Sequence, residues 1–285
     1  MSAGGLAPDG PDAAAMILAL HLLALGLYSA AWVLQLREFR RGRESGHGGV
    51  RITAGGFAAH AAALGLFTLT YRSLPLIGLG PASSSLALVM VLFVLAASIH
   101  VDLRPAGLFL LPPVLLLVGE AVLVGVGPTA GQLAFRGPWF VLHVTAAFLG
   151  YAGLAAASAA AIMYVLQFRA LKRKEFGSVF RFFPPLDSLD RLNKVGLAVG
   201  FPALTVGLLA GWSWTLTFGR GLALEDAQTI LGMVTWVVYL IAIAARLRPG
   251  PHGERAAAIS AAAFVVTLAA FLALRLLAGE PDFFL

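Results

Sequence analysis

The sequence contains no cysteine, and this absence excludes several kinds of chemistry. Disulfide bonds, thiolate catalysis, CxxC redox motifs and CxxCH attachment of a prosthetic group all need the missing sulfur. The motifs of several large enzyme classes are absent as well, since there is no P-loop, no zinc-binding HExxH and no nucleophile elbow. The candidates that remain for chemistry are histidines, aromatic residues and a few charged side chains.

Charged residues are also scarce. Only 12% of the 285 residues are charged and 59% are hydrophobic, whereas a soluble domain is roughly a quarter charged. The formal net charge of +6 invites a nucleic-acid interpretation. We reject it, because the basic residues lie between apolar runs, as they do in the cytoplasmic loops of membrane proteins. The composition indicates an integral membrane protein.

The apolar runs are long enough to be transmembrane helices, which need about 20 residues each. Polar segments divide the chain into eight such runs, at 13–36, 50–70, 83–102, 106–126, 138–168, 195–217, 228–247 and 255–278. We therefore expect an all-α fold, a polytopic membrane helix bundle, as a single integral membrane domain over residues 1–285. Small residues in the fifth run, such as Gly150 and Gly153, allow neighbouring helices to approach closely.

The distribution of basic residues predicts the orientation of the bundle. Sixteen of the 20 lysines and arginines lie in the first, third, fifth and seventh loops. The positive-inside rule places these loops in the cytoplasm and both termini outside. The N-terminal segment carries Asp9 and Asp12 and lacks the basic region of a signal peptide, so we expect it to be a short outer tail. The expected location is the bacterial cytoplasmic (inner) membrane.

The longest inner loop combines aromatic and basic residues. Phe176, Phe180, Phe182 and Phe183 lie among them, and Pro184-Pro185 ends any helix that precedes it. Basic aromatic segments commonly lie on the anionic inner leaflet. We expect this loop to dock on that leaflet or on a cytoplasmic protein.

Two histidines lie inside apolar runs, which is costly for an ionisable side chain. They are His21 in the first run and His60 in the second, close to the expected bilayer midplane. Each is either a functional residue or a neutral imidazole that is hydrogen-bonded across helices. The other polar residue of note is Glu120, the one carboxylate within an apolar run, which either pairs with Arg275 or reaches toward the surface.

The fifth run has a distinctive pattern. It begins with Trp139 at the expected membrane edge, carries His143 in its first turns and ends on a basic cluster at 169–174. The segment LHVTAAFLGYAGLAAASAAAIMYVLQ, from Leu142 to Gln167, contains both His143 and Tyr151. With two later stretches, Pro184 to Trp214 and Thr235 to Phe264, it resembles the cytochrome c assembly family of haem-handling membrane proteins, especially its HemX/YpjD-like branch.

The resemblance implies a haem b site. In that interpretation His143 is an axial ligand or entry contact at the outer face, and His60, together with His21, is an intramembrane contact. His143 and His60 would be the metal ligands. The resemblance further implies that Trp139, Trp212 and Trp214 form apolar walls, that Tyr151 lies near the site, and that Arg275 meets a propionate. These cofactor-binding candidates are His143, His60, His21, Trp139, Tyr151, Trp212, Trp214 and Arg275.

The sequence also departs from the family pattern. Trp212, Trp214 and Asp226 remain, but the segment GRGLALEDAQ stands where the Trp-rich outer motif is expected, and no outer histidine follows Trp214. This departure favours an accessory branch of the family. The first hypothesis is a haem-binding or haem-handling protein of cytochrome c biogenesis that works with other assembly proteins.

Two alternatives stay open. The first is a non-enzymatic regulator of tetrapyrrole synthesis, which would bind a cytoplasmic enzyme of that pathway through its inner loops. The second is a small-solute transporter, although the sequence shows no repeat of short, broken helices in its two halves.

Overall fold

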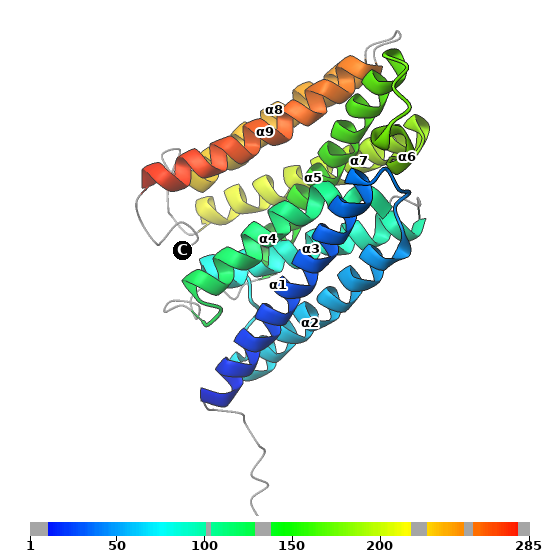
Figure 1. The fold of residues 1–285 in the computed structure, drawn as a ribbon. Coiled ribbons are helices and arrows are strands. Elements are labelled where there is room, and N and C mark those ends of the chain that lie inside the picture. The colour runs from blue at the N-terminus through cyan, green and yellow to red at the C-terminus, as the bar shows by residue number, and fades with distance from the viewer. Residues whose placement is uncertain (1–10, 101–103, 129–137, 218–226, 248–252, 279–285) are drawn as a thin grey trace, which may run out of the picture.

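The computed structural model describes residues 11–100, 104–128, 138–217, 227–247 and 253–278, and within these ranges it is helical without any β-strand. The elements in order are α1 (Pro11–Arg40), α2 (His47–Tyr71), α3 (Leu79–His100), the 3₁₀ turn η1 (Arg104–Ala106), α4 (Gly107–Val124), α5 (Pro138–Lys172), α6 (Ser178–Phe182), α7 (Leu186–Thr217), α8 (Ala227–Leu247) and α9 (Gly253–Ala278). Figure 1 shows the long helices running side by side. The prediction of an all-α bundle is confirmed.

Most of the long helices suit a membrane. Among the described residues, α1 to α5, α7 and α8 are long and apolar enough to cross one. The eighth expected run corresponds to α9, whose 26 residues extend over about 39 Å at ~1.5 Å per residue. The protein is therefore a multi-pass membrane protein.

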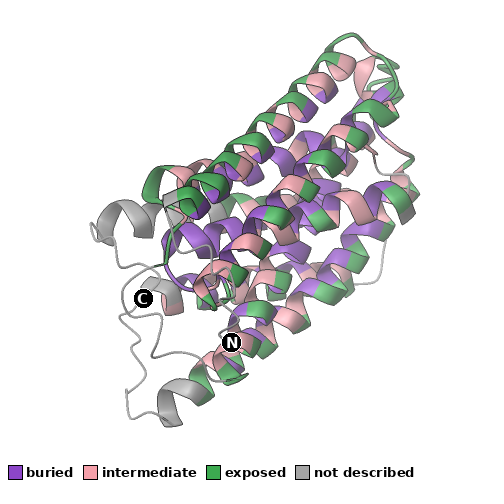
Figure 2. Cartoon of the chain, turned by 90° about the horizontal axis from the view of Figure 1, so that it is seen from below, coloured by how far each residue is buried: buried purple, intermediate pink, exposed green. Residues whose placement is uncertain are grey.

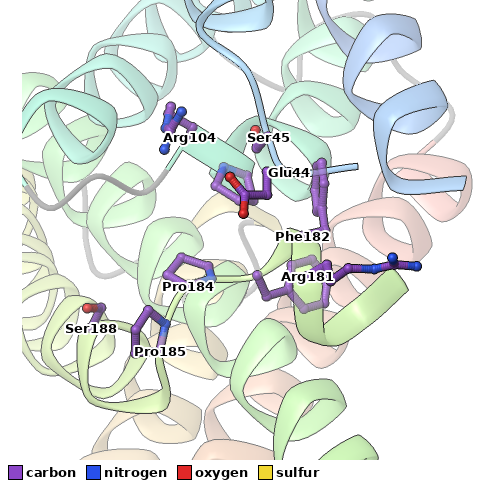
Figure 3. Close-up of a pocket in the computed structure, with 10 residues that line it drawn as sticks. Glu44, Ser45, Arg104, Arg181, Phe182, Pro184, Pro185 and Ser188 are labelled. Carbon is purple, nitrogen blue, oxygen red and sulfur yellow. The ribbon is translucent and has the colours of Figure 1, made fainter. Parts of the chain in front are cut away.

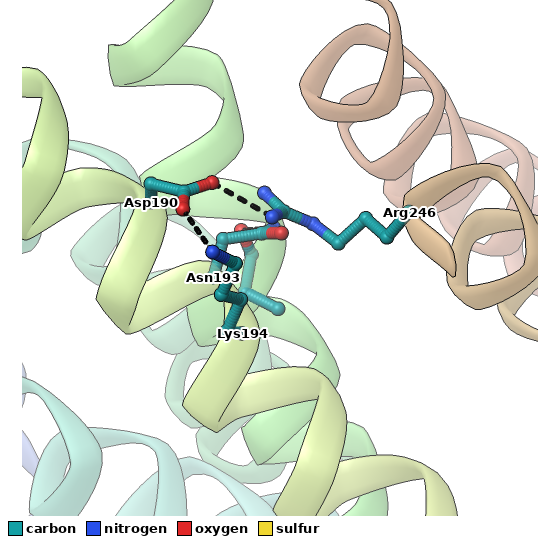
Figure 4. Close-up of polar contacts among 5 residues, drawn as sticks. Asp190, Asn193, Lys194 and Arg246 are labelled. Carbon is teal, nitrogen blue, oxygen red and sulfur yellow. Dashed lines mark hydrogen bonds and ion pairs between the residues drawn. The ribbon is translucent and has the colours of Figure 1, made fainter. Parts of the chain in front are cut away.

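The largest departure from the expected boundaries is at the start of α7. The apolar pattern placed this helix at 195–217, but it begins at Leu186. The extra turns are polar yet well anchored, because Asp190 accepts hydrogen bonds from Arg246 at 2.7 Å and from Lys194 at 2.6 Å (Figure 4). Hydropathy marks the part of a helix that lies in lipid, so it misses turns that project beyond the hydrocarbon core.

Helix α5 lies at the centre of the bundle. It packs against α3, α7 and α9, while α1 pairs with α2 and α8 pairs with α9. Its stretch from Ala152 to Ala161 is buried throughout and consists almost entirely of small side chains, which let neighbouring backbones come close. The buried residues gather in the middle of the bundle, and the exposed ones face outward (Figure 2).

The basic loops meet at one end of the bundle. Residues of the first, third and fifth loops line a common hollow there, and Arg169 at the end of α5 pairs with Glu254 at the start of α9 at 3.4 Å. The Arg246–Asp190 pair joins the end of α8 to the start of α7 at the same end. The assignment of this end to the cytoplasm stays a prediction from charge.

Two phenylalanines of the fifth loop are not on the surface, so the docking prediction was wrong for them. Phe182 and Phe183 are 2% and 5% exposed. They pack against Phe39 of α1, with ring centroids 5.4 and 5.7 Å away. Only Phe176 and Phe180 remain exposed, at 63% and 40%. The buried rings of Phe182 and Phe183 thus fix this segment to the bundle, because burying an aromatic ring removes a large apolar area from water.

Candidate functional site

His143 lies in the second turn of α5, half-buried, at the end of the bundle away from the basic loops. Its Nδ1 is 2.6 Å from the carbonyl oxygen of Gly207 on α7. Because a carbonyl only accepts, Nδ1 carries the proton and Nε2 keeps its lone pair. No described residue makes a hydrogen bond to Nε2. This is the arrangement in which a histidine binds a metal through one nitrogen and is oriented through the other.

One glycine of α7 makes room for this ring, and a second lets α7 approach the backbone of α5. A Cβ added at Gly211 would lie 2.6 Å from Cε1 and 2.7 Å from Nδ1 of His143. One turn earlier, a Cβ at Gly207 would lie 3.0 Å from the backbone nitrogen of Ala147. The sequence reasoning missed both residues, although the spacing in GLLAG at 207–211 is the small-xxx-small pattern of close helix pairs.

The aromatic candidates have different surroundings. Trp139, one turn before His143, is 57% exposed, and Trp212, next to Gly211, is 50% exposed. Both belong to the same end of α5 and α7, so their role as apolar walls stays a prediction. Trp214 and Arg275 lie in helices, but their side chains are outside the described residues.

Tyr151 lies two turns further along α5 than His143 and faces α8. Its side chain is half-buried and packs in the cluster of Leu154 and Tyr239. Its ring therefore contributes to the packing of α5 against α8. A contact between Tyr151 and a ligand stays a prediction.

The structure brings His21 and His60 together, but in the α1–α3 group, apart from the α5–α7 contact that holds His143. Both are buried, at 1% and 0% exposure, and their ring centroids are 5.4 Å apart. Each Nε2 lies near the hydroxyl of Ser84 on α3, at 2.9 Å for His21 and 2.7 Å for His60. One serine thus joins two imidazoles from two other helices.

The direction of each hydrogen bond in this cluster can be assigned. Nδ1 of His21 is 2.8 Å from the carbonyl of Ile17 and must donate to it, so its Nε2 accepts from Ser84. The serine oxygen then accepts from Nε2 of His60, whose Nδ1 accepts from Tyr28 at 3.3 Å. All four ring nitrogens are therefore engaged. Iron ligation by His60 or His21 would require the loss of one of these bonds, and it stays a prediction.

Three consecutive serines near the start of α3 connect it to α1, α2, α4 and the preceding loop, and the sequence reasoning missed them. Ser83 donates to Glu120 of α4 at 2.9 Å, Ser84 holds the two histidines, and Ser85 donates to the carbonyl of Pro75 at 2.6 Å. Successive helical residues are about 100° apart, so each hydroxyl faces a different element. The available signal was a run of hydroxyl groups within an otherwise apolar helix.

The site at His143 suits a cofactor that needs only one or two ligands from the protein. Among the described residues no group of three or more His, Cys, Asp or Glu side chains is placed to hold a metal ion. A haem iron already has four ligands from its macrocycle, and a single histidine completes a five-coordinate site. The imidazole of His143 fits that requirement, because it is fixed through Nδ1 and its Nε2 has no partner among the described residues.

Parts of this chain are similar to known proteins. The family described as "Cytochrome C assembly protein" matches residues 53–279, a range that includes His60 and His143 but not His21. "Cytochrome c biogenesis protein CcsA" of Chlamydomonas reinhardtii is 30% identical over 147 residues, covering 52% of this chain and 40% of that protein. "Protein HemX" of Bacillus subtilis is 27% identical over 139 residues, covering 49% and 50%. The chain spans about half the length of the curated relatives it matches.

Proposed function

Because the chain belongs to the cytochrome c assembly protein family, we propose that it binds haem b at its outer end and handles it in cytochrome c biogenesis. The observation that carries this proposal is the state of His143, whose Nδ1 is held by Gly207 while Nε2 is unpaired among the described residues. A carbonyl partner of this kind fixes the ring and makes the other nitrogen a better ligand.

The surroundings of His143 suit a flat, largely apolar ligand with acidic edges. Trp139 and Trp212 expose apolar rings at the same end of the bundle. Arg275, in the last helix, is the residue of this chain that we expect to hold a propionate, because a guanidinium matches a carboxylate with two parallel bonds. A bound haem would supply an iron centre, and the protein would position it through the single imidazole.

A second candidate function is regulation of tetrapyrrole synthesis through the basic end. It is favoured by the match to HemX and by the exposed pair Phe176 and Phe180, whose ring centroids are 5.3 Å apart. Exposed aromatic residues beside basic ones are typical of protein contacts. A soluble tetrapyrrole-synthesis enzyme that co-purifies with the wild type, and is lost when both phenylalanines become serine, would favour this function.

Haem titration of variants tests the first proposal. The full chain, purified in detergent, is titrated with haemin while the Soret absorption is followed. We expect His143→Ala to weaken binding at least about tenfold, because the iron loses its ligand. Gly211→Ala should weaken it as well, because the new Cβ occupies the place of the ring.

Two matched variants serve as controls. His47→Ala removes an exposed histidine at the start of α2, and Gly119→Ala adds a Cβ that meets nothing within 4 Å. Both should bind haemin as the wild type does. An unchanged titration of His143→Ala would show that the ligand lies elsewhere.

A further inference from the structure

A hollow of about 250 Å³ opens at the basic end of the bundle, opposite His143. Figure 3 shows Glu44, Ser45 and Arg104 on one side of it and Pro184, Pro185 and Ser188 on the other. It is lined by Glu44, Ser45, Arg104, Pro105, Arg181, Phe182, Phe183, Pro184, Pro185 and Ser188. These residues come from the first, third and fifth loops and from the start of α7, so the hollow exists only because the loops converge.

Ser45 gives the first sign that the hollow receives a ligand. The residue is only 6% exposed, and its hydroxyl has no hydrogen-bond partner among the described residues. It does not cap α2, whose N-cap is Gly46 without a side-chain bond. A buried hydroxyl without a partner is unfavourable. A ligand in the hollow that accepts a hydrogen bond would remove that cost.

The charges around the hollow favour an anion. Arg104 and Arg181 both line it, and the exposed side chain of Arg181 lies beside Gly42 at its edge, so its guanidinium would rotate to reach a ligand. The 32-residue helix α7 begins at Leu186, directly after the lining residue Pro185, and a helix N-terminus carries partial positive charge. The carboxylate of Glu44, which also lines the hollow, would repel an anion. Two guanidinium groups, a hydroxyl donor and a helix N-terminus together match a phosphate group.

We propose that this hollow binds the phosphate of an anionic phospholipid headgroup. At roughly 30 Å³ per water, its volume of about 250 Å³ holds a phosphate and part of its ester. The buried rings of Phe182 and Phe183 form apolar walls. The basic loops place the hollow at the level of the headgroups, where anionic lipids attract arginine. This site is separate from the haem site and does not depend on it.

Lipid titration of the full chain in detergent tests the proposal, with phosphatidylglycerol as the probe and binding followed by native mass spectrometry. Arg181→Gln should weaken binding about tenfold, as loss of a charge-assisted hydrogen bond does. Ser45→Ala should weaken it about fivefold without lowering the melting temperature of the lipid-free protein, because the hydroxyl has no partner to lose. Glu44→Gln should strengthen binding, because it removes the opposing charge.

The control is Arg173→Gln, which removes an exposed charge outside the lining of the hollow. Equal weakening by Arg173→Gln and Arg181→Gln would overturn the proposal, because only surface charge would be acting. Equal binding by all variants would also overturn it, because the residues of the hollow would then not contact the lipid. Inorganic phosphate is titrated in parallel. If inorganic phosphate displaces the bound lipid as effectively as added phosphatidylglycerol does, the site belongs to a soluble phosphoryl compound and the lipid assignment is wrong.

Discussion

Ser84 shows how one hydroxyl can fix two histidines inside a membrane protein. It donates to His21 and accepts from His60, so neither imidazole needs to be charged. A neutral, fully hydrogen-bonded histidine is tolerated in lipid, whereas an unpaired one is costly. The cluster therefore stabilises the packing of α1, α2 and α3, whatever further role the histidines have.

Ser84→Ala tests this role in stability. The substitution leaves the buried Nε2–H of His60 and the lone pair of His21 without partners, so we expect a loss of about 1–3 kcal/mol. Thermal unfolding in detergent, followed by size-exclusion fluorescence, measures the change. Ser29→Ala is the matched control, because its hydroxyl bonds only to the carbonyl of Leu25 in the preceding turn. If the two variants melt alike, the histidine cluster contributes no stability.

The sequence singled out His21, His60 and His143 as unusual, but not the residues that hold them. His60 and His143 stand out, because an imidazole is unusual in an apolar run. Ser84 and Gly211 do not stand out, because serine and glycine are ordinary in membrane helices. Their roles depend on which helix each one faces. That in turn depends on the rotation and tilt of the helices, which are set by packing against neighbouring helices and not by apolar length alone.

Helices α5 and α7 form the most extensive contact between elements of the described residues. A Cβ added at Gly153 would lie 2.9 Å from Cα of Gly200, and one added at Gly150 would lie 2.8 Å from the backbone nitrogen of Leu204. Such contacts bring two backbones within van der Waals distance, and in lipid this packing is a main source of helix association. The same contact presents the carbonyl of Gly207 to His143, so α7 acts as the support of the proposed haem ligand.

Gly200→Ala tests the importance of this contact. The added Cβ would lie 2.8 Å from the backbone nitrogen of Leu154 and 3.0 Å from the carbonyl oxygen of Gly150, so the helices must separate. We expect a destabilisation of about 1–3 kcal/mol, as overpacking usually gives. The melting temperature in detergent measures it against Gly119→Ala, whose Cβ would meet nothing. Equal melting temperatures would mean that the contact adapts without cost.

At the scale of elements, the sequence predicted which helices exist better than where they end. All eight expected runs correspond to long helices, because an apolar run of sufficient length has few other options in a membrane. The start of α7 was missed by nine residues, because polar residues interrupt the apolar pattern there, although Leu189 and Leu192 are buried in the core and Asp190 is held by Arg246 and Lys194. Figure 4 also shows Asn193 in this region, and its amide donates to the carbonyl of Ala157 on α5 at 2.6 Å.

The whole molecule has two distinct ends. One gathers the basic loops and the hollow with Ser45, and the other carries His143 and the exposed tryptophans. The positive-inside rule assigns the first end to the cytoplasm. With this orientation a haem bound at His143 would face the outer side of the membrane.

The orientation can be measured because the chain has no cysteine. Single cysteines are introduced in place of Ser2 and Ser178, and intact cells are treated with a membrane-impermeant thiol reagent. We expect labelling at position 2 and none at position 178 until the membrane is permeabilised. Labelling of position 178 in intact cells would reverse the orientation and place His143 on the cytoplasmic side.

The central claim is that His143 is a haem ligand, and chemical rescue of His143→Gly tests it most directly. This variant leaves space for free imidazole, which can replace the missing ring. The absorption spectrum of the detergent-purified protein is recorded with haemin, before and after imidazole is added. We expect a Soret band in the wild type, its loss in His143→Gly and its return with imidazole. A wild type that takes up no haemin, or a variant whose Soret band equals that of the wild type without imidazole, would contradict the claim.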